Sequence, residues 1–75
     1  MNAMNETITI RTEYIKLQDA LQLAGLVRSG GEAKTVVQAG EVSVNGRVCT
    51  ERGRKLRPGD EVSFAGKTLQ LAYGN

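Results

Sequence analysis

The chain has 75 residues, 40% of them hydrophobic and 24% charged, and a formal net charge of +2. This length and composition predict one globular domain with a small core, and no apolar run approaches the roughly 18 residues of a membrane-spanning helix. Cys49 is the only cysteine and there is no histidine, which predicts a cytoplasmic protein without disulfide, metal site, cofactor or catalytic base.

The domain is expected to begin shortly after the N-terminus. Residues 1–6 are polar and lack the apolar core of a signal peptide, so they are expected to form a flexible arm. Residues 7–12 alternate apolar residues with β-branched polar ones, which predicts a strand. A single domain is therefore expected over residues 7–72, with residues 73–75 as a tail.

Two short helices are predicted next. Apolar residues recur at three- and four-residue spacing over residues 15–24, which predicts a helix that ends at Gly25. Ser29 is followed three residues later by Glu32, the pattern of a capping box. A second helix is therefore expected to begin directly after Ser29 and to end at Gly40.

The second half of the chain has the apolar period of strands. The expected strands carry Val42 and Val44, Arg47 to Cys49, Val62 and Phe64, and Leu69 and Leu71. Asn45-Gly46 predicts a type I′ hairpin turn, Pro58-Gly59-Asp60 a second turn and Ala65-Gly66 a third. The elements together predict an α+β fold in the order β-α-α-β-β-β-β.

The start of the second helix is a candidate phosphate site. Gly30 and Gly31 leave the first-turn amides uncovered, and these amides carry the positive end of the helix dipole. Lys34 lies one turn further on, on the same side. The alternative interpretation is that Ser29 is only a cap and that the glycines only give the helix a flexible start.

A second candidate is the basic stretch of residues 47–57, which holds five cationic residues and one acidic residue. A run of charge is often a solvated loop, but this one lies between two hairpins and could bind a phosphate backbone. The candidate cations are Arg47, Arg52, Arg54 and Lys55.

Other kinds of site find little support in the sequence. Aromatic residues are scarce, and Phe64 is in register with Val62, so it is expected in the core and not as a platform for bases. Cys49 has no histidine to activate it and is expected to be a small buried hydrophobe. The eight carboxylates are scattered and form no metal-binding pattern.

The order of these features resembles the S-four RNA-binding domain, also called the alpha-L motif. The matching residues are Lys16-Leu17, Leu21, Gly25, Ser29, Ala33-Lys34, Gly40 to Gly46, and Pro58 to Val62. The resemblance implies two short helices packed on a small, mainly antiparallel sheet. It also implies binding of structured RNA, such as ribosomal or transfer RNA, without catalysis.

The short chain looks like a stand-alone bacterial member of that family. The expected partners are structured RNA and the ribosome or another RNA-processing assembly, and the protein is expected to be a monomer. Two departures concern the expected RNA surface: Gly30 stands where the family has an arginine, and Lys16-Leu17-Gln18 replaces its Arg-Leu-Asp. Either these departures shift the expected contacts toward Arg52, Arg54 and Lys55, or they lower the affinity for RNA.

Two other functions are open at this point. The half from Glu41 onward also resembles ubiquitin-like sulfur carriers, but those act through a terminal Gly-Gly, whereas this chain ends Tyr73-Gly74-Asn75. A protein-interaction module would explain the fold and leave the basic stretch unused.

Overall fold

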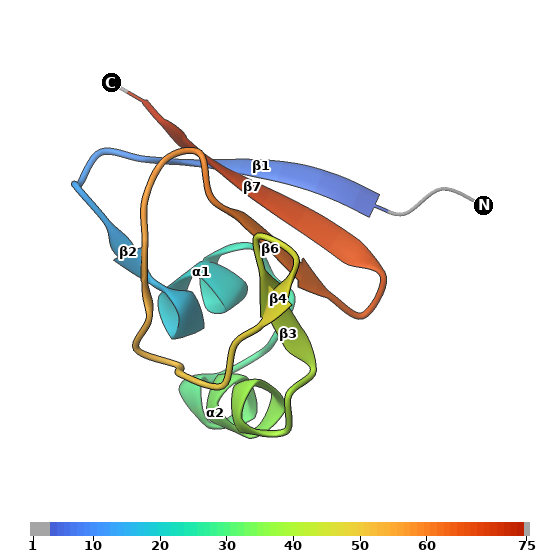
Figure 1. Ribbon diagram of the computed structural model, residues 1–75. Coiled ribbons are helices and arrows are strands. Elements are labelled where there is room, and N and C mark those ends of the chain that lie inside the picture. The colour runs from blue at the N-terminus through green and yellow to red at the C-terminus, as the bar shows by residue number, and fades with distance from the viewer. Residues whose placement is uncertain (1–3, 75) are drawn as a thin grey trace.

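The computed structural model describes residues 4–74 and has the predicted α+β architecture (Figure 1). Its elements are β1 (Met4–Ile10), β2 (Ile15–Lys16), α1 (Leu17–Leu23), α2 (Gly30–Gln38), β3 (Val42–Val44), β4 (Arg47–Val48), β5 (Lys55–Leu56), β6 (Glu61–Phe64) and β7 (Lys67–Tyr73). Within this part of the chain, neither helix has the length and apolar character needed to cross a membrane.

The main sheet has five strands in the order β1-β7-β6-β3-β4. Strand β1 pairs with β7 in parallel, and the other neighbours are antiparallel, so the sheet is mainly antiparallel as expected. These five strands are the ones predicted from the sequence. A second sheet, made only of β2 and β5, was not predicted.

The first strand begins earlier than predicted. Residues 4–6, expected in a flexible arm, pair with residues 67–69 of β7, whereas residues 1–3 of that arm lie outside the described residues. Strand pairing uses backbone hydrogen bonds, so polar residues such as Asn5 and Glu6 can also pair with the long strand β7. The strand ends at Ile10, two residues short of the prediction, and the proposed domain boundaries stay a prediction.

Helix α1 is shorter than predicted because its first two residues belong to a strand. Ile15 and Lys16 pair with Leu56 and Lys55, so the helix begins only at Leu17. At the other end Gly25 adopts a φ of 73°, and the N–H of Leu26 donates to the carbonyl of Leu21 at 2.9 Å. This left-handed ending confirms Gly25 as the helix stop.

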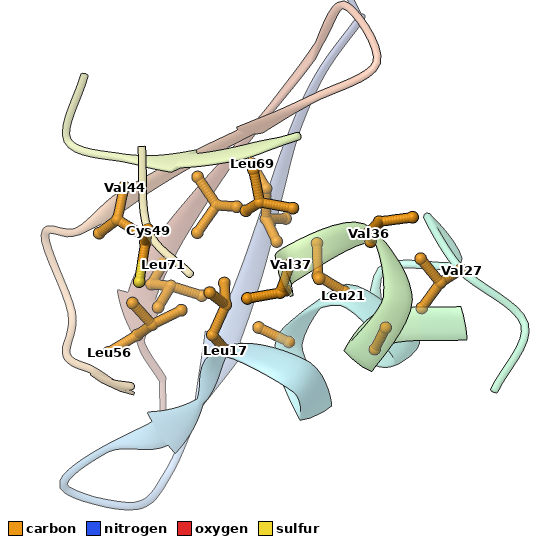
Figure 2. Close-up of a cluster of buried hydrophobic side chains, with 14 residues drawn as sticks. Leu17, Leu21, Val27, Val36, Val37, Val44, Cys49, Leu56, Leu69 and Leu71 are labelled. Atoms are coloured by element: carbon orange, nitrogen blue, oxygen red, sulfur yellow. The ribbon is translucent and has the colours of Figure 1, made fainter. Parts of the chain in front are cut away.

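The core lies between the helices and the main sheet (Figure 2). Its largest fully buried side chains are Leu17, Leu21, Val37, Val42, Leu56, Val62 and Leu69. Cys49 belongs to this core at 6% exposure, as predicted for a small hydrophobe. Phe64 is half-buried and packs against the same cluster, which agrees with its expected place in the core.

Candidate functional site

The start of α2 has the predicted cap, with one difference. The Ser29 hydroxyl accepts a hydrogen bond from the Glu32 N–H at 3.2 Å. The Glu32 carboxylate reaches back to the N–H of Arg28 at 2.7 Å, one residue beyond the expected partner. A Cβ on Gly30 or on Gly31 would meet its nearest atom at 3.7 Å or 3.8 Å, which is ordinary contact. Space does not require glycine at these two positions, so their effect is to leave the backbone amides uncovered.

The basic stretch is held against the first turn of α1. The carbonyl of Arg54 accepts from the N–H of Leu17 at 2.8 Å, and the carbonyl of Arg52 accepts from the N–H of Gln18 at 2.9 Å. Helix α1 has no side-chain cap, so these loop carbonyls satisfy amides that would otherwise be unpaired. The exposed side chains of Arg52 and Arg54 therefore extend from a backbone that is tied to the helix.

The β2–β5 pairing adds a cation that the sequence analysis did not place in the site. Lys16 lies directly opposite Lys55, and both side chains are exposed. The Lys55 Nζ lies 4.8 Å from the centroid of the Tyr14 ring, a cation–π contact. Lys16 was missed because the sequence placed it in a helix, and only the pairing with β5 brings it beside the basic stretch.

Glutamines of α1 connect the basic stretch to the start of α2. The N–H of Gln18 bonds to Arg52, and the carbonyl of Gln18 accepts from Gln22 Nε2 at 3.4 Å. Gln22 Nε2 in turn is the atom nearest to a Cβ on Gly30. The two regions therefore contact residues of α1 that lie one helical turn apart.

We call this surface the basic face. Lys34 joins it because it lies four residues after Gly30 and so shares that side of α2. The basic face consists of Lys16, Ser29, Gly30, Gly31, Lys34, Arg52, Arg54 and Lys55.

Arg47 is separated from the basic face. It lies in β4 opposite Val44, at the edge of the main sheet. Its neighbour Val48 is 3.6 Å from the Cβ position of Gly40, which follows the C-terminal end of α2. Arg47 therefore lies near the C-terminal end of α2, whereas Ser29 caps the N-terminal end.

Two motif residues that carried the family resemblance hold the end of the basic stretch. Asn45 Nδ2 donates to Asp60 Oδ1 at 3.0 Å, and Asp60 Oδ2 accepts from the N–H of Arg57 at 2.8 Å. Partial burial raises the pKa of Asp60, but these hydrogen bonds and the charges of Arg54 and Arg57 outweigh it and hold the pKa below its ordinary value. The hairpin turn and the Pro-Gly-Asp turn therefore support each other.

The cations of the basic face are available to an external anion. None of the side-chain hydrogen bonds found in residues 4–74 is donated by a lysine or arginine side chain. Over the same residues the surface has no pocket and no group of three metal-binding side chains. The arrangement suits contact with phosphates spread along a polyanion, since each cation is presented at the surface.

Comparisons with known proteins identify relatives whose names refer to RNA binding and to the ribosome. The S4 domain family matches residues 8–72. RlbA of Bacillus subtilis, named a candidate ribosome maturation protein, is 44% identical over 63 residues, which are 84% of this chain and 89% of that protein. YbcJ of Escherichia coli, named a candidate RNA-binding protein, is 40% identical over 58 residues, which are 77% of this chain and 83% of that protein.

A solved structure extends the similarity to three dimensions. The solution structure of YbcJ from E. coli, described as revealing an alpha-L motif involved in RNA binding, matches this fold with a TM-score of 0.66. The two sequences are 33% identical, and the match covers 96% of this chain and 90% of that one. The fold is therefore the one that the resemblance implied.

Proposed function

The chain belongs to the S4 domain family, and we propose that it binds structured RNA through the basic face without catalysing a reaction. The observation that carries the proposal is the arrangement around α1. Loop carbonyls tie Arg52 and Arg54 to its first turn, and Gln22, about one turn further along α1, lies against the start of α2. Cations and helix-terminal amides both bind phosphate, so the basic face is suited to an RNA backbone.

The recognition is expected to rest on shape and charge. Phe64 packs against the core, the Tyr14 ring has a lysine ammonium over it, and the exposed Tyr73 lies in β7, outside the basic face. Stacking on bases, the usual way of reading single strands, is therefore a minor contribution. A folded RNA presents its phosphates at defined spacings, which cations on a fixed backbone framework can recognise.

Ribosomal or transfer RNA is the proposed ligand. The name of the relative RlbA supports a ribosomal target, as a partner in assembly of the ribosome. A cytoplasmic location and a monomeric state stay expectations from the sequence. The sulfur-carrier alternative is not favoured, because the S4 domain family match accounts for residues 8–72.

The proposal is tested by a salt titration of binding to a structured ribosomal RNA fragment, with a DNA duplex of similar length as comparison. If four or five phosphates are engaged, log K falls with log salt with a slope of about −3 to −4. The double variant Arg52→Ala/Arg54→Ala should lose about two units of that slope and weaken binding to all RNAs. Its thermal midpoint should stay nearly unchanged, because both side chains are exposed.

A matched control removes two cations outside the basic face, in Arg11→Ala/Lys67→Ala, and should leave the slope nearly unchanged. Arg47→Ala separately measures whether the RNA extends to the far end of α2. No RNA binding at low salt would contradict the proposal and would favour a protein-interaction module. Equal slopes for the two double variants would remove the basic stretch from the interface.

A further inference from the structure

The small β2–β5 sheet places two like charges side by side. It contains only two residue pairs, Ile15 with Leu56 and Lys16 with Lys55. Leu56 is fully buried, so the first pair faces the core, and the second pair, whose side chains are exposed, faces outward. Residues directly opposite in an antiparallel pair have Cβ atoms about 5 Å apart, and like charges there repel each other.

The two lysines cannot relieve this repulsion by separating their strands. The backbone on both sides is tied by the bond from the Leu17 N–H to the Arg54 carbonyl, directly beside the lysine pair. Burial of Leu17 and Leu56 in the core holds the same two segments from beneath (Figure 2). The Lys55 ammonium also lies over the Tyr14 ring, 4.8 Å from its centroid. The two lysines therefore stay paired at the backbone, and their like charges leave the same face of the small sheet.

We propose that Lys16 and Lys55 form a clamp for one phosphate group, and that in the RNA complex this group is a backbone phosphate next to those bound by Arg52 and Arg54. This clamp rests on the proposed RNA-binding function and assigns to Lys16 and Lys55 one shared phosphate within the basic face. Each lysine is a compact charge on a flexible stem, so two stems about 5 Å apart can converge on one anion. An anion between them turns the repulsion into two attractions.

The clamp predicts a combination of changes in stability and RNA affinity that a lysine with only a structural role would not produce. Lys16→Gln removes one of the two repelling charges and leaves the Lys55–Tyr14 contact in place. In the free protein at low salt this variant should melt at a higher temperature than wild type. Its RNA affinity should fall, on the order of five- to tenfold, and its salt slope should become shallower by about one unit. Stability and binding therefore change in opposite directions.

The experiment measures the thermal midpoint without RNA and the RNA dissociation constant for wild type, Lys16→Gln, Lys16→Arg and Lys67→Gln. Lys16→Arg keeps the charge and should retain most of the affinity. Lys67→Gln removes a lysine from β7, outside the basic face, and should change neither quantity much. A lower midpoint for Lys16→Gln, or an RNA affinity equal to that of Lys67→Gln, would overturn the clamp.

A second measurement needs no RNA and therefore separates the clamp from the proposed function. Inorganic pyrophosphate is titrated into the protein at constant ionic strength while the backbone amide signals are followed by NMR. The signals of Lys16 and Lys55 should shift in wild type and should shift much less in Lys16→Gln. Absence of RNA binding with this shift present would refute the proposed function alone, whereas equal shifts in both proteins would refute the clamp.

Discussion

Asp60 shows how a single acidic residue can support a basic surface. Its carboxylate accepts hydrogen bonds from Asn45 and from the backbone of Arg57, so it holds the end of the basic stretch in place. Both carboxylate oxygens have hydrogen-bond partners in the two turns, and the nearby charges of Arg54 and Arg57 favour the ionised form. The residue therefore positions the stretch and is not expected to contact RNA.

The lowered pKa of Asp60 predicts a pH-dependent contribution to stability. Because the folded pKa lies below the unfolded value of about 3.9, the ionised side chain stabilises the protein above that value, and this contribution is lost as the pH falls through the folded pKa. Asp60→Asn should lower the free energy of unfolding at pH 7 by about 1 kcal/mol, the size of one hydrogen bond. Urea denaturation at pH 7 and at pH 2 checks this, and a difference from wild type that is equal at both values would contradict it.

At the scale of elements, the start of α2 combines a structural role with a proposed binding role. The Ser29 hydroxyl caps the helix whether or not a phosphate is bound. The uncovered amides of Gly30 and Gly31, by contrast, matter only for an anion. The two roles can be separated because the cap acts on stability and the amides act on binding.

Ser29→Ala should lower the free energy of unfolding by about 1 kcal/mol, because one N–H of the first turn loses its acceptor. Thermal or urea denaturation measures the change. Ser63→Ala, a substitution on a half-buried strand position of β6, is the matched control and should have a smaller effect. Equal effects of the two substitutions would show that the cap does not contribute.

At the scale of the whole molecule, the basic stretch depends on the core. Leu56 is the fully buried residue of β5, and it lies in the same cluster as Leu17 and Leu71 (Figure 2). It thus ties the segment that carries Arg54 and Lys55 to the centre of the fold. A domain of this size has a small margin of stability, so each such anchor matters.

Leu56→Ala should lower the free energy of unfolding by about 2–5 kcal/mol, because it leaves a cavity in a close-packed core. Leu23→Ala removes a leucine of α1 that is 61% exposed and should cost far less. Urea denaturation of the two variants makes the comparison. Similar losses would mean that β5 is not anchored through Leu56.

Much of the fold could be predicted because its signals are local. Caps, helix stops and hairpin turns depend on residues a few positions apart. Asn45 and Gly46, with φ values of 52° and 84°, have the positive angles that a type I′ turn requires. The five strands of the main sheet and both helices were predicted on this basis, with errors only at their ends.

The site could be predicted only in part. Ser29, Gly30, Gly31 and Lys34 belong to one helix start, and Arg52, Arg54 and Lys55 to one short segment, so the sequence alone identified both groups. It could not show that α1 joins them, that Arg47 lies apart, or that Lys16 faces Lys55. The last of these relations depends on pairing between β2 and β5, each only two residues long and therefore without a periodic signal. Contacts between segments distant in the chain are decided by the packing of Leu17 and Leu56 in a shared core, which only the tertiary structure reveals.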